Sequence, residues 1–193
     1  MHVSRTHSKK GTLLKLFGKH AAAISPDKHA TSAIEFALFV PLLVVGLLNT
    51  VEVSRYYYQA MEVENAAQMG AQAAWKTCNK NSLLPAMKYC PELVTAVQAA
   101  VQSTSLGSNI TLQAGFPSEA YFCLDSGNAL KSVGDATKVV EPKDCSAVGM
   151  ATLKPADYIQ INTTFTYVPL FADLTIVHNF PNPLIKNAYM RLD

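Results

Sequence analysis

The sequence predicts an α+β protein: a long N-terminal helix, partly transmembrane and partly exported, that packs on a small antiparallel sheet and is stapled by disulfides. Three observations predict this class. Residues 36–51 carry no charge, helix-forming residues continue beyond them, and later segments alternate apolar and polar residues. With 193 residues, the chain is long enough for one ordinary domain and an anchor, and too short for two large domains.

Positive charge gathers at the N-terminus. The chain has a net charge of +2, but residues 1–30 contain six Lys or Arg and a single acid, Asp27. By the positive-inside rule, residues 1–30 form a basic cytoplasmic leader, and the chain after about residue 55 is exported. Apart from the adjacent Lys9 and Lys10, the cations are scattered, with Leu, Phe and Ala between them. Membrane topology and anionic lipid explain this pattern better than nucleic-acid binding, so no nucleic-acid partner is expected.

The next segment, residues 31–54, is predicted to be a single transmembrane helix, because roughly 20 residues span the hydrocarbon core. A buried core helix of a soluble protein would show a polar stripe, and residues 36–48 have none. A cleaved signal peptide would have a shorter apolar region and an A-x-A-like site, which residues 49–55 do not offer. Two residues do not suit a plain anchor: Glu35 is ionisable, and Pro41 removes a helical hydrogen bond.

Residues 55–76 are predicted to continue the same helix outside the membrane, to about Trp75, because they are rich in good helix formers and contain no proline. After Tyr56, mostly small residues recur every three or four positions, a spacing that lets another helix approach closely: Ala60, Val63, Ala67, Gly70 and Ala74. This small-residue stripe is interpreted as a surface for lateral packing with other subunits or as the cover of the chain's own sheet, and both can hold. Residues 56–58, three tyrosines, are interpreted as an aromatic belt at the outer membrane interface.

Two motifs carry a family resemblance: TSAIEFALFVPLLV at residues 31–44 and NAAQMGAQAA at residues 65–74. On these residues the chain resembles the TadE-like family, the minor pilins or pseudopilins of the tight-adherence (Tad, or Flp) type IV pilus of bacteria. The resemblance spans residues 29–75, and a weaker one covers residues 158–171 and 187–193. It implies a pilin-like fold in the inner membrane. The implied partners are other pilin and pseudopilin subunits, Tad inner-membrane assembly proteins, a prepilin peptidase and the lipid bilayer.

The resemblance also implies processing and an assembly role for the helix. In type IV pilins a prepilin peptidase cuts just before the residue four positions ahead of a glutamate, which implies a cut between Ala30 and Thr31 here. Ala30 stands where the family most often has glycine. Glu35, followed by Phe36 and later by Pro41, then belongs to an assembly helix that also contains the small-residue stripe. Its carboxylate would be neutralised by the new α-amino group of a neighbouring subunit.

Residues 77–193 are predicted to form a periplasmic or extracellular α+β domain. Residues 92–103 predict an amphipathic helix whose apolar face contains Leu93, Val94, Val97, Ala100 and Val101. Alternation and proline punctuation predict strands at residues 109–113, 121–124, 157–168, 174–178 and 186–192, packed on the exported half of the long helix. The glycine- and proline-containing stretch 125–157 is expected to be a long loop.

The four cysteines, an even number, all lie on the exported side, which favours two disulfides in an oxidising compartment. Four cysteines allow three connectivities. We favour Cys78 with Cys90 and Cys123 with Cys145, because these pairs close the loops nearest in sequence. Zinc is the alternative, but the chain has no C-x-x-C pair, so no metal site is expected.

The sequence contains no motif of a common catalytic site, and His178 is the only histidine outside the leader. We therefore expect neither an enzyme nor a cofactor. The resemblance favours a TadE-like minor pilin or pilus-assembly protein that acts by lateral helix packing in pilus biogenesis, adhesion and surface attachment. The alternative is a membrane-tethered binding module in which residues 77–193 recognise a ligand. An enzyme anchored in the same way is a distant third.

Overall fold

The structure is a computed structural model that describes residues 28–78 and 80–193, so the leader before residue 28 lies outside it. The first element is helix α1, Lys28–Cys78, with 51 residues. It contains the predicted continuous helix and extends it by three residues at each end. The chain divides into two compact units at Gly46 and Leu47.

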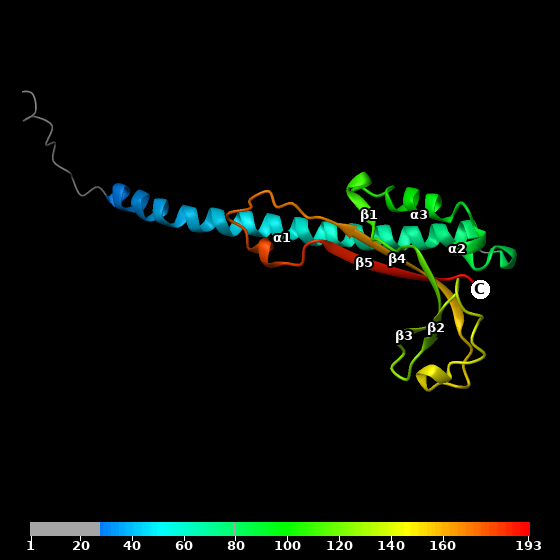
Figure 1. The fold of residues 1–193 in the computed structure, drawn as a ribbon. Coiled ribbons are helices and arrows are strands. Elements are labelled where there is room, and N and C mark those ends of the chain that lie inside the picture. The colour runs from blue at the N-terminus through cyan, green and yellow to red at the C-terminus, as the bar shows by residue number, and fades with distance from the viewer. Residues whose placement is uncertain (1–27, 79) are drawn as a thin grey trace, which may run out of the picture. The chain divides into compact units, whose positions relative to one another are not determined.

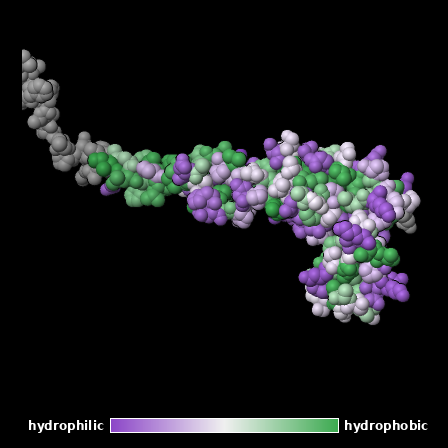
Figure 2. Space-filling model, viewed as in Figure 1, coloured by the Kyte–Doolittle hydropathy of each residue, from purple (hydrophilic) through white to green (hydrophobic). Residues whose placement is uncertain are grey.

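The described part of the first unit is the apolar beginning of α1. Its large side chains are turned to the outside, with Phe36 67% and Leu42 73% exposed, and Figure 2 shows this segment as mostly hydrophobic. Among the described residues, α1 is the one helix long and apolar enough to cross a membrane, and none of its most apolar window is buried. A helix that is apolar all round and unburied is typical of a membrane span.

The second unit, Leu47–Asp193, is an α+β domain (Figure 1). The rest of α1 packs with a five-stranded antiparallel sheet and with helix α3, Leu93–Val101, while the four-residue helix α2, Ala86–Tyr89, follows α1. The strands are β1 Ile110–Leu112, β2 Ser118–Leu124, β3 Leu130–Asp135, β4 Ala156–Phe165 and β5 Leu184–Arg191. The fold class predicted from the sequence is confirmed.

Strand β4 is the centre of the sheet. One edge of β4 pairs with β5 from Tyr158 to Phe165, while its other edge pairs with β2 at one end and with β1 at the other. Alternate β4 residues are buried, Ile159, Ile161 and Thr163 among them, as the period-two pattern predicts for a strand with one covered face. This covered face forms the core together with α1 and α3.

Three sequence predictions are wrong in detail. Residues 174–178 were expected to be a strand, but Ile176–Asn179 form a 3-10 helix, because this segment pairs with α1 side chains and not with the sheet. The expected loop 125–157 contains strand β3, which pairs with β2. On the α3 face, Leu93, Val97 and Val101 are buried, whereas Val94 is exposed, so that the buried face of α3 is narrower than predicted.

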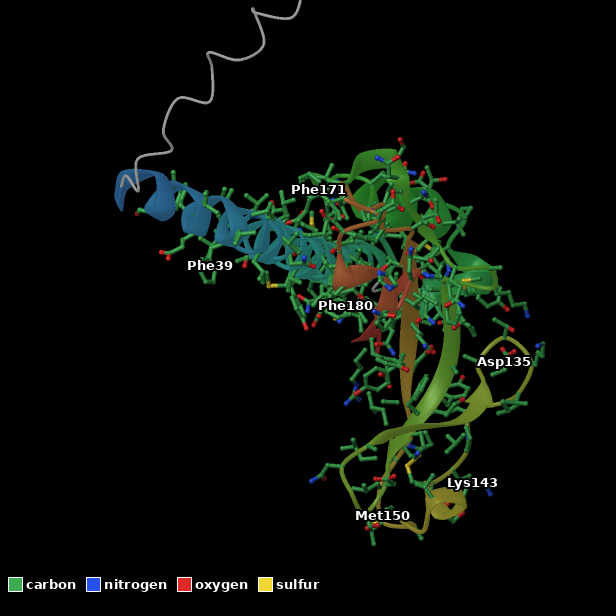
Figure 3. All side chains as sticks on the ribbon, turned by 90° about the vertical axis from the view of Figure 1, so that its left-hand side faces the viewer. Phe39, Asp135, Lys143, Met150, Phe171 and Phe180 are labelled. Carbon is green, nitrogen blue, oxygen red and sulfur yellow. A yellow bond between two sulfur atoms is a disulfide. The ribbon has the colours of Figure 1, made fainter. Side chains whose placement is uncertain are left out.

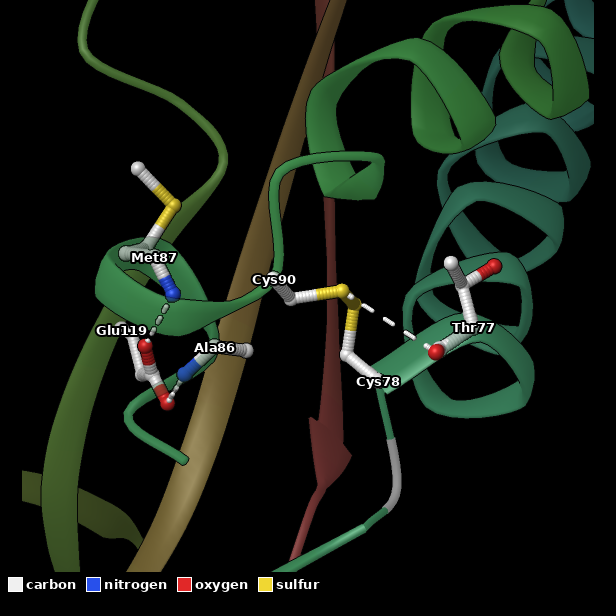
Figure 4. Close-up of a disulfide and its surroundings, with 6 residues drawn as sticks. All are labelled: Thr77, Cys78, Ala86, Met87, Cys90 and Glu119. Carbon is white, nitrogen blue, oxygen red and sulfur yellow. Dashed lines mark hydrogen bonds between the residues drawn. A yellow bond between two sulfur atoms is a disulfide. The ribbon is translucent and has the colours of Figure 1, made fainter. Parts of the chain in front are cut away.

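Two disulfides join Cys78 to Cys90 and Cys123 to Cys145, the pairing favoured from the sequence. The first ties the end of α1 to the end of α2 (Figure 4). Beside it, the buried carboxylate of Glu119 on β2 accepts hydrogen bonds from the backbone N–H groups of Ala86 and Met87, both at 2.7 Å. The second disulfide holds the connection between β3 and β4 against the β2–β3 hairpin.

Candidate functional site

The small-residue stripe of α1 lies in the core of the chain. Ala60, Val63, Ala67 and Ala74 are buried there together with residues of α3 and β4. A Cβ atom on Gly70 would lie 2.9 Å from Val101 and 3.2 Å from Ile161. The small residues of the stripe thus let α3 and β4 approach α1 closely, which agrees with the interpretation that the stripe covers the chain's own sheet. The side chains of the stripe are not free to contact a neighbouring helix.

The stripe extends back into the last turns of the predicted membrane segment, residues 31–54, through two polar residues. Asn49 and Glu52 precede Tyr56 at intervals of three and four, which places all three on one helix face. Sequence reasoning missed both polar residues as site residues, although the periodicity of the stripe continues back to them. They contact residues 166–183, which link β4 to β5 and which we call the C-terminal strap.

Glu52 is fully buried. Its Oε1 accepts hydrogen bonds from the Tyr167 hydroxyl and from the backbone N–H of Leu170, the latter at 3.1 Å. The Arg55 guanidinium lies 3.9 Å from the same oxygen. A buried carboxylate is costly unless it is hydrogen-bonded or paired. These partners from the strap and from the next helical turn therefore fix the position of the strap on α1.

Tyr167 is the strap residue most affected by this arrangement. Burial, and then the hydrogen bond to Glu52 and the charge of its carboxylate, raise the pKa of Tyr167 to about 12. The hydroxyl therefore stays protonated at any physiological pH and remains a donor to Glu52.

Asn49 holds the strap one turn nearer the N-terminal end of α1. Its side-chain amide donates to the carbonyl of Leu174 at 2.9 Å and accepts from the N–H of Ile176, also at 2.9 Å. A second amide, that of Asn182, makes the same two bonds to the backbone of Tyr167, at 2.9 and 3.0 Å. Asn49 thus makes the donor and acceptor hydrogen bonds to the strap backbone that a neighbouring strand would make. Asn182 makes the corresponding bonds within the strap itself.

Tyr56 belongs to this contact and not to an aromatic belt. It is buried, its ring packs edge-on against Tyr167 and Phe180, and its hydroxyl donates to the carbonyl of Pro181 at 2.9 Å. Only Tyr57 and Tyr58 are exposed, so the prediction for this triplet is wrong for its first member. Figure 3 labels Phe171 and Phe180 in the strap, on opposite sides of α1.

The predicted processing residues lie in the first turns of the described helix. The backbone is helical at Ala30 and Thr31, and Glu35, Phe36 and Pro41 are exposed. After residue 55, the α1 face away from the sheet also exposes large side chains, Tyr57, Met61 and Trp75. The surfaces that α1 leaves for other molecules are therefore its apolar beginning and this outer face.

Comparison with known protein families gives a match to most of α1. Residues 30–72 match the family described as TadE-like protein. The resemblance proposed from residues 31–44 and 65–74 is confirmed, and the weaker one near the C-terminus lies outside the match. No curated protein and no solved structure matches the chain. The match covers less than a quarter of the chain. The family is associated with Tad pilus systems, which supports a general pilus-related role for this chain and involvement with pilus-assembly components.

The matched segment, residues 30–72, contains the α1 residues of the site up to Gly70. Asn49, Glu52 and Tyr56 all fall inside the match, as do the small-residue stripe up to Gly70 and the processing residues. The strap falls outside it. In the described residues, no group of three or more His, Cys, Asp or Glu is arranged to hold a metal ion.

A second buried carboxyl lies at the other end of β4. Asp157 is only 5% exposed, and its Oδ1 has no hydrogen-bond partner. Burial, followed by the charge of Glu119 and a hydrogen bond with it, raises the pKa of Asp157 from 3.8 to about 8. The folded protein therefore holds a proton on Asp157 that an unfolded chain releases at lower pH.

This proton makes stability depend on pH. Between pH 4 and pH 8 the unfolded state loses the Asp157 proton first, so the free energy of unfolding should fall as pH rises through this window. Replacing Asp157 by Asn should remove that dependence and raise the free energy of unfolding at pH 8 by about 1–3 kcal/mol. Denaturant titrations of the full chain in detergent at pH 5 and pH 8 measure both effects. An unchanged pH slope in Asp157→Asn would contradict the assignment.

Proposed function

We propose that this TadE-like chain is a minor pilin or pilus-assembly protein of a Tad-type system. It crosses the inner membrane once, with its N-terminus in the cytoplasm and residues 77–193 in the periplasm. It acts by lateral packing of α1 with other subunits and not by catalysis. The observation that carries the proposal is the combination of the family match with an apolar helix beginning whose large side chains no other described part of the chain covers.

Glu35 is the residue on which this assembly depends. It is an exposed carboxylate on the apolar part of α1 in the single chain, and a carboxylate within a membrane is expensive unless a partner compensates it. The α-amino group that a cut before Thr31 would create on a neighbouring subunit is such a partner. Assembly would therefore be favoured where the two groups meet.

Glu35→Ala tests the proposal. The variant should still insert in the membrane, but it should no longer enter pili or co-purify with pilin subunits. Glu92→Ala is the matched control, because Glu92 is also exposed but lies at the start of α3. Piliation and co-purification that survive Glu35→Ala would contradict the assembly role.

The N-terminus of the extracted protein tests the processing step separately. A chain that begins at Thr31 is expected if a prepilin peptidase cuts after Ala30. Peptide sequencing or intact mass of membrane-extracted protein measures this. An intact Met1 would mean that the chain stays in the membrane as an assembly component.

A further inference from the structure

We propose that the C-terminal strap is a membrane-docking element that lies in the interfacial layer of the bilayer that α1 crosses, with its exposed aliphatic side chains among the lipids. The inference requires only that α1 is inserted in a bilayer. It does not depend on whether the chain enters a fibre. Three observations carry it.

The first observation is the level at which the strap meets α1. Roughly 20 residues of helix cross the hydrocarbon core, so a span that begins near Thr31 ends near Val51. Asn49 lies within its last turn, and Asn49 holds Leu174 and Ile176 through two hydrogen bonds of 2.9 Å. The strap is therefore attached to α1 where the helix leaves the membrane.

The second observation is the surface of the strap. It exposes four aliphatic side chains within nine residues: Val168 (67%), Leu170 (60%), Leu174 (55%) and Ile176 (54%). At the same level α1 exposes Val51 and Tyr57. Single exposed apolar residues are ordinary, but a group of them marks a contact with protein or membrane. Aliphatic side chains beside tyrosines are typical of the membrane interface.

The third observation is that the strap pairs its backbone with side chains of α1. The N–H groups of Leu170 and Ile176 donate to Glu52 and Asn49. The carbonyls of Val168, Leu174 and Pro181 accept from Arg55, Asn49 and Tyr56. Water would satisfy these groups in an ordinary surface loop, whereas lipid cannot. Irregular backbone whose polar groups are paired internally is what a position at the edge of the hydrocarbon requires.

Charge identifies the kind of lipid contact. The strap contains one acid, Asp173, and no Lys or Arg. Electrostatic attraction to anionic lipids therefore does not hold it, and burial of aliphatic surface does. Docking should occur on a zwitterionic bilayer such as phosphatidylcholine.

A fluorophore on Ile176→Cys tests the proposal in the full chain, with one chain in each phosphatidylcholine nanodisc. The four native cysteines are all in disulfides, so the introduced thiol is the only free one. Val94→Cys is the matched control, because Val94 is a β-branched residue of similar exposure (51%) on α3. Leu174→Cys gives a second strap position should Ile176→Cys fail to fold.

The strap label should lose most of the iodide quenching seen for the Val94 label and should be quenched by nitroxide-bearing lipids. Equal iodide quenching at both positions would overturn the proposal. Protection of the strap label that appears only with several chains in one disc would overturn it too, since a neighbouring chain and not lipid would then cover the strap. Peptide mapping of both disulfides shows that each variant is folded.

Discussion

Replacing Glu52 by Ala should lower the free energy of unfolding by about 2–4 kcal/mol, because it removes the carboxylate that accepts from the Tyr167 hydroxyl and the Leu170 N–H. The Tyr167 hydroxyl keeps only the longer contact to the backbone carbonyl of residue 52, at 3.4 Å. The strap should detach from α1 before the rest of the domain unfolds. Denaturant titration of the full chain in detergent measures the first effect. Faster hydrogen exchange at Leu170 and faster proteolysis within residues 166–183 measure the second.

Two comparisons separate this effect from a general loss of charge. Glu64→Ala should cost less than about 1 kcal/mol, since Glu64 is half-exposed and only forms a surface ion pair with Lys186 at 3.4 Å. Tyr167→Phe combined with Glu52→Ala should cost less than the sum of the two single changes, because both remove the same hydrogen bond. Additive costs, or an unchanged strap in Glu52→Ala, would contradict the assigned contact.

Replacing Gly70 by Leu should lower the free energy of unfolding by about 3 kcal/mol, as expected for extra volume forced into a packed core. A Cβ atom added at this position would lie 2.9 Å from Val101 and 3.2 Å from Ile161. The longer side chain has to push α3 and β4 away from α1. Denaturant titration of the monomer in detergent measures the cost.

Gly46→Leu is the matched control, because nothing lies within 4 Å of a Cβ atom at Gly46. It should leave the stability of the domain unchanged. The monomer measurement also distinguishes the two interpretations of the small-residue stripe. A Gly70→Leu monomer of normal stability that fails only in assembly would mean that the stripe packs against other subunits and not against the chain's own α3 and β4.

Much of the fold can be predicted from local sequence patterns. The continuation of α1 after residue 54 follows from helix-forming residues without a proline. Strand β4 follows from an alternating pattern, and residues 157–165 alternate in burial. Both signals are local and need no knowledge of distant contacts. The strand predicted at residues 174–178 was wrong, because these residues, although typical of strands, form part of a 3-10 helix. Asn49, which lies 127 positions from Ile176 in sequence, binds the backbone of this helix.

The candidate site was predicted only in part. The periodicity of small residues located the packed face of α1 correctly, but periodicity does not say what packs there. The same spacing continues toward the N-terminus to Glu52 and Asn49. Their roles could not be predicted, because their partners Tyr167, Leu170 and Ile176 lie more than 100 residues away in sequence. Tyr56 was assigned to a membrane belt for the same reason.

The sequence by itself therefore determined the apolar segment long enough to cross a membrane, the α+β fold class, the disulfide pairing and the resemblance to the TadE-like family, because apolar length, periodicity and cysteine spacing act over short distances. Only the tertiary structure decided which α1 face is occupied by the chain itself and which is left for partners. It also decided that the strap closes on α1 at the end of the membrane segment. Buried hydrogen bonds such as those of Glu52 depend on groups that meet only when the whole domain folds.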